Sequence, residues 1–285
     1  MSQLRRRRGR AAALAIAAAL AFAAFASPPA GADADADASG VRHADLAPDV
    51  ALTGVLQAYW RVHWIDGETE ARMLYLRFFP DARSLGALPA IELGDRPAAA
   101  PAIVDLHRDG AGDPPFDLDF AVEEARPWLD AVFGAVPADF LRHREGQIAA
   151  PATLRLRRLS SSVECDTQLY FADIVALARA EGADAGLRDA VARGEGPAGG
   201  CSAAAPWREY FVARPAAGAE AVALRRAPDD RAPVTAQLPA GRQLLKLRTV
   251  DEAWLEAVPR DAAETAPVDA AGAGYVRRDA LAPVN

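Results

Sequence analysis

Chemically reactive side chains are scarce in this sequence of 285 residues. Lys246 is the only lysine, which excludes Ser-Lys pairs and Schiff-base lysines from the rest of the chain. The four histidines are scattered, and none has the i, i+4 spacing with which a helix binds zinc. A Gly-x-Ser-x-Gly motif is also missing. We therefore expect a protein that is not an enzyme and that holds no cofactor and no metal ion.

Basic charge is scarce outside the N-terminus. The chain has 32 Lys and Arg against 39 Asp and Glu, and five of the arginines lie in the first 26 residues, which contain no acidic residue. Without that segment, 27 basic residues face 39 acidic ones, a net charge of −12. Neutralising nucleic acid phosphates requires clustered Lys and Arg. We therefore expect no nucleic acid partner.

The N-terminus has the features of a secretory signal peptide. Arginines at positions 5–8 and 10 precede a run of small apolar residues from Ala11 to Ala26. This run is shorter than the ~20 apolar residues that span a bilayer. Two small-residue motifs, ending at Ala26 and Ala32, are alternative cleavage sites. We predict a signal peptide over 1–26, a disordered linker over 27–48, and a periplasmic or secreted protein without a membrane span after signal removal.

The chain has only two cysteines, Cys165 and Cys201. An even number of cysteines in an exported chain predicts a disulfide between them. The bond would close a loop of 36 residues (201 minus 165) and contribute roughly 4 kcal/mol in the chain-entropy model. The alternative is a nucleophilic Cys165, as in cell-wall peptidases. It is disfavoured because the neighbouring Glu164 and Asp166 would raise the pKa of a thiol.

Residues 49–180 predict an α+β domain of unknown function. Alternation of β-forming residues indicates two hairpins, 54–64 with 71–79 and 153–159 with 168–177. In the first hairpin, alternation places Trp60, Val62 and Trp64 on one face, which we expect to be core. His63 is expected to be a half-buried imidazole with a hydrogen-bond partner rather than a metal ligand.

Several weaker elements complete this domain. Short strands are expected at 89–93 and 102–106, and the second hairpin is expected to become helical toward Ala180. One or two helices over 120–142 are expected to break at Pro127 and Pro137. The segment 105–113 partly matches a calcium loop, but position 12 is Phe116 instead of the required glutamate. A surface turn is the simpler interpretation.

The last part of the chain has the sequence pattern of a small β-barrel. Residues 181–206, rich in Gly and Ala, are expected to connect the first domain to it. Over 207–285, short β-forming runs alternate with turn residues, and Gln243 to Thr249 is predicted as a strand. Four runs stand out: Val222 to Pro228, Pro233 to Gly241, Ala253 to Val258, and Gly274 to Val276.

In this order the four runs resemble the strands of a bacterial SH3 (SH3b) domain, over about residues 219–284. The loop 259–273 is longer than is usual in that family. The resemblance implies a small SH3-like β-barrel. We therefore expect a mostly β or α+β fold class, with a first α+β domain of β-hairpins followed by this barrel at 207–285.

The SH3b resemblance implies a binding module, in which Trp254 and Tyr275 occupy positions of structural or groove-lining aromatic residues. We expect an exported, non-enzymatic envelope protein whose module binds a peptide, a cell-wall component or a partner protein. In the main alternative, an auxiliary or inhibitory protein, the first domain recognises an envelope enzyme and the module is a scaffold. A cell-wall hydrolase is a third class, and it would need a catalytic constellation that the sequence does not show.

Overall fold

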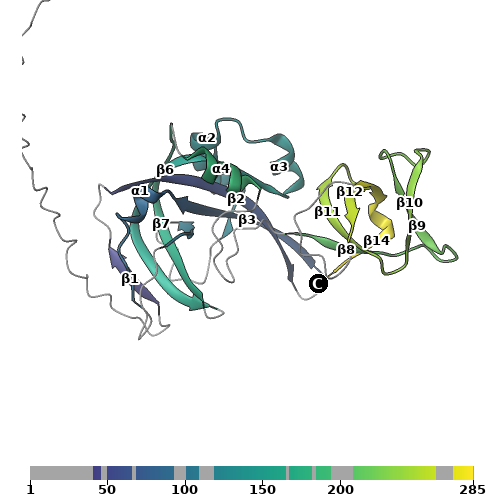
Figure 1. Cartoon of the computed structure of the whole chain (residues 1–285), viewed down its shortest axis with the longest axis horizontal. Helices are drawn as coiled ribbons and strands as arrows, with labels where there is room; N and C mark the ends of the chain where they lie inside the picture. The colour runs from purple at the N-terminus through teal and green to yellow at the C-terminus, as the bar shows by residue number, and fades with distance from the viewer. Residues whose placement is uncertain are drawn as a thin grey trace, which may run out of the picture. The chain divides into compact units, whose positions relative to one another are not determined.

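The computed structural model describes residues 41–45, 50–65, 69–92, 101–108, 119–164, 167–181, 184–193, 208–260 and 272–284. Within these ranges the chain folds into two seven-stranded sheets with four α-helices (Figure 1). The predicted fold class, mostly β with helices and a small barrel, is confirmed. The predicted signal peptide and both cysteines lie outside the described residues.

The first sheet and its helices occupy the chain up to residue 192. Its strands are β1 (Arg42–Asp45), β2 (Ala51–Ile65), β3 (Thr69–Pro80), β4 (Val104–Arg108), β5 (Asp119–Phe120), β6 (Gln147–Glu164) and β7 (Thr167–Arg179). The helices are α1 (Ala82–Leu85), α2 (Val122–Phe133), α3 (Ala138–His143) and α4 (Ala185–Ala192). β1 lies at one edge, beside β6, and β5 pairs with β3.

Five strands of the first sheet close into a barrel. β2 pairs with β3 and β6, β3 pairs with β4, and β6 pairs with β7. A parallel pairing of β4 with β7 completes the ring. Closure leaves these five strands without free edges. The sequence predicted hairpins in this region and a barrel at 207–285, so the closed ring lies in the part of the chain where no barrel was expected.

Both predicted hairpins are formed. β2 and β3 pair from Ile65–Thr69 to Gly54–Pro80, and β6 pairs with β7 along most of its length. Trp60 and Val62 are buried as predicted. Position 54 has no room for a side chain, because a Cβ atom on Gly54 would lie 2.2 Å from the carbonyl oxygen of Phe79.

Two weaker strand predictions were wrong. β7 remains a strand to Arg179 instead of becoming helical, because β6 offers an antiparallel partner up to the Ala152–Arg179 pair. Residues 89–92 form no strand. Ile91 packs into the core there instead, and its carbonyl accepts a hydrogen bond from Gln168.

The predicted helix break at Pro127 is also wrong, because α2 continues through it. The proline removes one backbone hydrogen bond. Ala125, Leu129 and Val132 are fully buried on the face of α2 that packs against the barrel strands, and this burial offsets the loss. The predicted interruption at Pro137 is correct, since α3 begins at the next residue.

Structure also appears in two segments where none was predicted. β1 pairs with β6, and Val41 and Ala44 are buried, so the predicted disorder of 27–48 is wrong for residues 41–45. The predicted connector 181–206 contains α4, capped by the Asp184 side chain. Val191 of α4 is fully buried in a small cluster with Val55 and Phe79.

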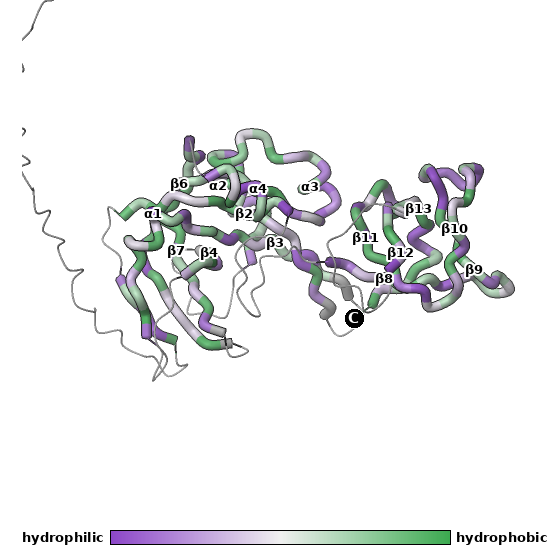
Figure 2. The backbone as a smooth tube through the Cα atoms, in the orientation of Figure 1, coloured by the Kyte–Doolittle hydropathy of each residue, from purple (hydrophilic) through white to green (hydrophobic). Residues whose placement is uncertain are grey.

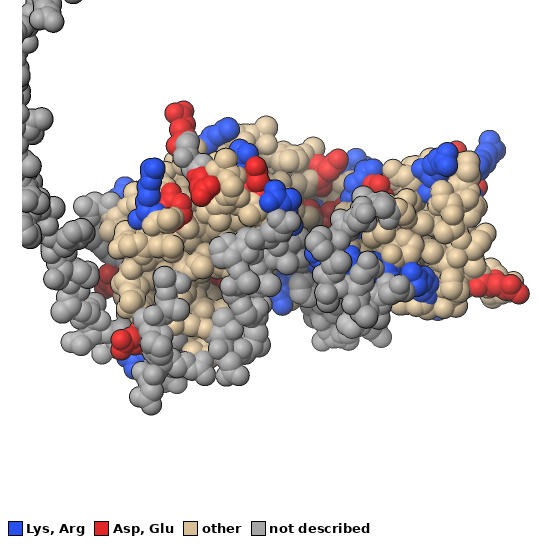
Figure 3. Space-filling view, in the orientation of Figure 1, with Lys and Arg blue, Asp and Glu red and all other residues tan. Residues whose placement is uncertain are grey.

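The C-terminal sheet has the strand order β10-β9-β13-β12-β11-β8-β14. Its elements are β8 (Tyr210–Ala213), β9 (Ala221–Arg225), β10 (Val234–Pro239), β11 (Gln243–Thr249), β12 (Trp254–Pro259), β13 (Gly274–Arg277), the 3-10 helix η2 (Arg278–Ala280) and β14 (Leu281–Pro283). The predicted strand 243–249 is confirmed as β11. Hydrophobic and hydrophilic stretches alternate along the chain (Figure 2), and basic and acidic side chains are interspersed on the face drawn in Figure 3. One face of the sheet carries a core that includes Leu224, Leu244, Leu255 and Val276.

Candidate functional site

Trp254 and Tyr275, the two aromatic residues predicted to bind ligand, lie on the same face of the C-terminal sheet. Leu255 and Val276 are paired and point into the core. Because side chains alternate along strands, their neighbours point to the opposite face. On that face Trp254 lies opposite Arg277, and Tyr275 lies opposite Glu256. The structure therefore brings the two predicted residues to one surface.

The two aromatic side chains differ in exposure. Trp254 is only 6% exposed, and the Arg277 guanidinium lies 5.7 Å from its ring centre. Its backbone N–H donates to Asp251 at 2.9 Å, which fixes the turn before β12. Tyr275 is half-buried. Trp254 is thus packed against its surroundings, and Tyr275 presents part of its ring to solvent.

A polar row surrounds Tyr275. Arg225 of β9 is its neighbour on one side and Glu256 of β12 on the other. Arg248 of β11 donates to Glu256 at 2.6 Å. This bond and the nearby Tyr275 phenol raise the pKa of Arg248. A half-buried ring can stack on a flat group of an extended ligand, and the flanking guanidinium and carboxylate groups can hydrogen-bond the ligand's backbone.

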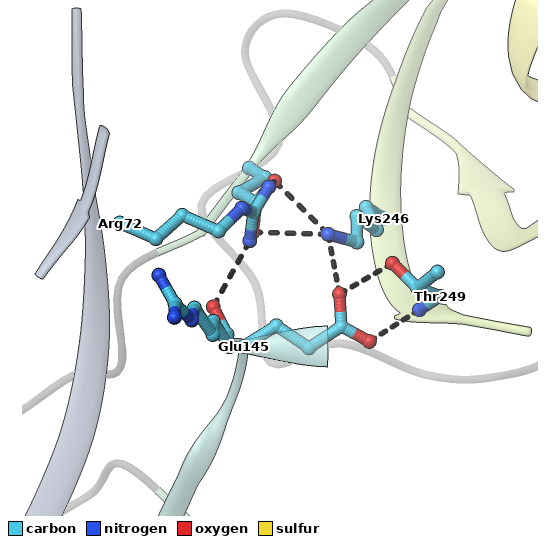
Figure 4. A network of polar contacts seen from close by, with 6 residues as sticks. Arg72, Glu145, Lys246 and Thr249 are labelled. Atoms are coloured by element: carbon cyan, nitrogen blue, oxygen red, sulfur yellow. Dashed lines mark hydrogen bonds and ion pairs between the residues drawn. The ribbon is translucent and has the colours of Figure 1, made fainter. Parts of the chain in front are cut away.

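A buried ion-pair network ties the C-terminal sheet to the first part of the chain (Figure 4). The ammonium group of Lys246, the sole lysine, lies 2.5 Å from Glu145 and 3.0 Å from Glu209. Arg72 of β3 binds both carboxylate oxygens of Glu209, at 2.9 and 2.8 Å. Thr249 donates its hydroxyl to Glu145 at 2.6 Å and its backbone N–H to the same carboxylate.

The network holds the Glu209 carboxylate in the charged form. Burial by itself would raise the pKa of Glu209, but hydrogen bonds and charges from Arg72 and Lys246 outweigh it and lower the pKa. The Lys246 side chain is 5% exposed. Lys246 is notable in the sequence for its rarity alone, because its partner Glu145 is more than 100 residues away along the chain.

A second buried polar group lies in the first sheet, on the face away from the main core. Arg77 donates to Asp105 at 2.6 Å and lies 5.1 Å from the ring centre of Tyr59. Tyr59 stacks on Tyr75 with ring centres 5.5 Å apart. Burial raises the pKa of both phenols. Asp105 is the first residue of the calcium-like segment, and its carboxylate is paired with Arg77.

Two histidines of this face are held by hydrogen bonds. His63 Nε2 lies 2.9 Å from the Tyr75 hydroxyl, which confirms the expectation of a half-buried imidazole with a partner. Burial lowers the pKa of His63. His107 Nδ1 lies 3.0 Å from Asp173, and its side chain is 5% exposed. An Asp–His pair can serve as a base, but this one is closed to solvent, so we assign it to barrel packing.

The remaining site predictions concern residues outside those described or features of the whole chain. The Cys165–Cys201 disulfide falls outside the described residues and stays a prediction, which titration of free thiols in the native and denatured protein would test. In the described ranges, no group of three His, Cys, Asp or Glu residues is placed to hold a metal ion. Over the same ranges no helix has the length and apolar character to cross a membrane.

Comparison with protein-family models, with curated proteins and with solved structures gave no match to this chain. The geometry of the two sheets therefore carries the functional argument.

Proposed function

We propose that this protein is an exported, non-enzymatic component of the cell envelope, and that its C-terminal sheet is an SH3b-like module that binds an extended peptide. The peptide belongs either to the cell wall or to a partner protein. The export part of the proposal rests on the charged and apolar segments of residues 1–26.

The order of the elements supports an SH3b-like module. A short strand, β8, is followed by the β9–β10 hairpin and then by the neighbouring strands β11, β12 and β13. The 3-10 helix η2 leads into β14, which returns to pair with β8. The four runs singled out in the sequence correspond to β9, β10, β12 and β13, in that order along the chain.

The partly exposed ring of Tyr275 is the single observation that carries the binding proposal. It lies on the face opposite the core, within a row of Arg225, Glu256 and Arg248. An aromatic ring offers contact area at little entropic cost, and the flanking charges supply hydrogen bonds to a peptide backbone. Trp254 supports this face from beneath Arg277.

Capture experiments with the mature protein test this proposal. Wild type is expected to co-sediment with purified cell-wall sacculi or to capture a partner from envelope extract. Tyr275→Ala should lose that capture. Tyr275→Phe is the matched control, because it keeps the ring and removes only the hydroxyl, and it should retain most of the binding.

Two results would count against the proposal. If Tyr275→Ala captures as much as wild type, the face around Tyr275 is not the binding surface, and the first domain carries recognition, as in an auxiliary or inhibitory protein. Release of soluble fragments from dye-labelled sacculi by the purified protein would instead indicate a hydrolase.

A further inference from the structure

A cavity of about 360 Å³ lies beside the ion-pair network, bounded by α3, by the turn between β11 and β12, and by η2. Ligand pockets in proteins have volumes of about 300–1,000 Å³, so this one has room for a ligand of one or two amino-acid residues. Charged side chains dominate its lining: Arg72, Arg142, His143, Asp251, Glu252 and Arg278.

The α3 side of the cavity is basic. Arg142 and His143 are the last two residues of α3. Arg72 lies beside them, but its guanidinium is occupied by Glu209. Arg142 has no ion-pair partner within the described ranges and is exposed. His143 Nε2 already lies 3.9 Å from the Asp139 carboxylate, so the guanidinium of Arg142 is the group on this side that an entering anion would meet.

The β11–β12 turn contributes two acidic residues to the lining. Asp251 accepts hydrogen bonds from the backbone N–H groups of Ala253 and Trp254, at 2.8 and 2.9 Å, which hold its carboxylate in place. Glu252, next to it, has no ion-pair partner in the described part of the chain. Arg278 of η2 lies near these acids in the lining, and its side chain also has no ion-pair partner among the described residues.

A lining with both basic and acidic groups favours a ligand that carries both charges. A simple anion would meet Asp251 and Glu252, and a simple cation would meet Arg142 and Arg278, so each would be repelled by one part of the lining. A ligand with one carboxylate and one ammonium group satisfies both parts. We propose that this cavity binds a small zwitterion, such as a free dipeptide, with its carboxylate at Arg142 and its ammonium at Glu252 and Asp251.

This site is separate from the face around Tyr275, so the inference goes beyond the proposed function and does not depend on it. The direct test is calorimetric titration of the mature protein at low salt with glycylglycine. N-acetylglycine, which keeps only the carboxylate, and glycinamide, which keeps only the amine, are the single-charge probes. Glycylglycine is expected to bind saturably, and both single-charge probes are expected to bind more weakly.

Variants of the lining residues test whether the measured heat comes from binding in the cavity. Arg142→Gln combined with Arg278→Gln should weaken glycylglycine binding by about tenfold or more, because the charge-assisted contact of Arg142 to the carboxylate is lost and Arg278 cannot replace it. Both residues are exposed, so the thermal midpoint should not change. Arg226→Gln, an exposed arginine on the β9–β10 turn, is the matched control and should bind like wild type. Glu252→Gln should weaken glycylglycine binding but not that of N-acetylglycine.

Three results would overturn the inference: no saturable binding of glycylglycine, binding of N-acetylglycine as tight as that of glycylglycine, or unchanged binding in the double arginine variant. Sedimentation with sacculi distinguishes this site from the proposed function. If the double arginine variant still sediments but no longer binds glycylglycine, two separate sites exist. If wild type binds glycylglycine but captures nothing from the envelope, the cavity stands and the proposed function fails.

Discussion

Trp254 and Tyr275 share a sheet face, but their surroundings assign them different roles. Trp254 is 6% exposed and packs against Arg277, whereas Tyr275 is half-buried in a polar row. Replacing a buried tryptophan with alanine removes a large contact area and leaves a cavity. We therefore expect Trp254 to contribute mainly to stability and Tyr275 mainly to binding.

Urea unfolding of single variants separates these roles. Trp254→Ala should reduce the free energy of unfolding by about 3–5 kcal/mol. Tyr275→Ala should reduce it by about 1 kcal/mol or less, because part of its ring is already in solvent. If Tyr275→Ala is as destabilising as Trp254→Ala, Tyr275 is a core residue and the binding face must be sought elsewhere.

The sequence singled out these two residues but did not place them on one face, because that depends on the register of β12 with β13. Nor did it show which ring is covered, because that depends on Arg277 lying opposite Trp254 on the neighbouring strand. Similarly, Lys246 was visible as the sole lysine, but its buried position depends on Glu145, from a distant part of the chain. Pairings of this kind leave no local pattern in a sequence.

At the scale of elements, β11 offers two ion pairs in contrasting environments. Lys246 is 5% exposed between Glu145 and Glu209, whereas the Arg248 side chain is 55% exposed in its pair with Glu256. Removing one partner of a buried ion pair leaves an uncompensated charge. An exposed pair contributes little, because water solvates the partner that remains.

Methionine substitutions at these two positions test this difference. Lys246→Met should lower the free energy of unfolding by about 3 kcal/mol, because two carboxylates then face each other with only Arg72 to balance them. Arg248→Met, on the same strand, should cost less than about 1 kcal/mol. Chemical denaturation of both variants gives the comparison. Equal costs would show that the network does not contribute to stability.

The same network predicts a loss of stability in acid. The pKa of Glu209 is lowered from its ordinary value of 4.5 by Arg72 and Lys246, against the effect of burial. A carboxyl group with a lowered pKa stabilises the folded state above the pKa of the unfolded chain, and this contribution is lost as pH falls through the folded pKa. Glu209→Gln lacks the contribution at every pH.

Unfolding free energies of wild type and Glu209→Gln between pH 7 and pH 3 test this effect. Wild type should be the more stable protein at pH 7, and the difference should shrink as pH falls below about 4.5. A difference that stays constant down to pH 3 would show that the Glu209 carboxylate is not stabilised in the folded protein.

Elements with a strong local pattern could be predicted from the sequence. The two hairpins, the strand 243–249 and the interruption at Pro137 follow from alternation and from proline chemistry. The predicted helix break at Pro127 was wrong because the burial of Ala125, Leu129 and Val132 offsets one missing hydrogen bond. β1 was missed because its partner is an edge of β6 more than 110 residues away, and a short polar strand has little pattern of its own.

At the scale of the whole molecule, closure of the first sheet was the feature least accessible to sequence reasoning. It depends on the parallel pairing of β4 with β7, between strands separated by two helices and a long hairpin strand. No turn signal or periodicity marks such a pairing. Strands of the C-terminal sheet were easier to predict, because short β-forming runs there are bounded by turn residues such as Pro228, Pro233 and Gly241.

Hydrogen exchange of the whole mature protein is the most direct test of the central claim, that the face around Tyr275 binds an envelope peptide. Exchange would be measured with and without soluble peptide fragments released from sacculi by a muramidase. If Tyr275 lies at the binding face, exchange should slow in β12 and β13, around Glu256 and Tyr275, with no change in β2 and β3. Protection confined to the first sheet, or the absence of any protection, would contradict the claim.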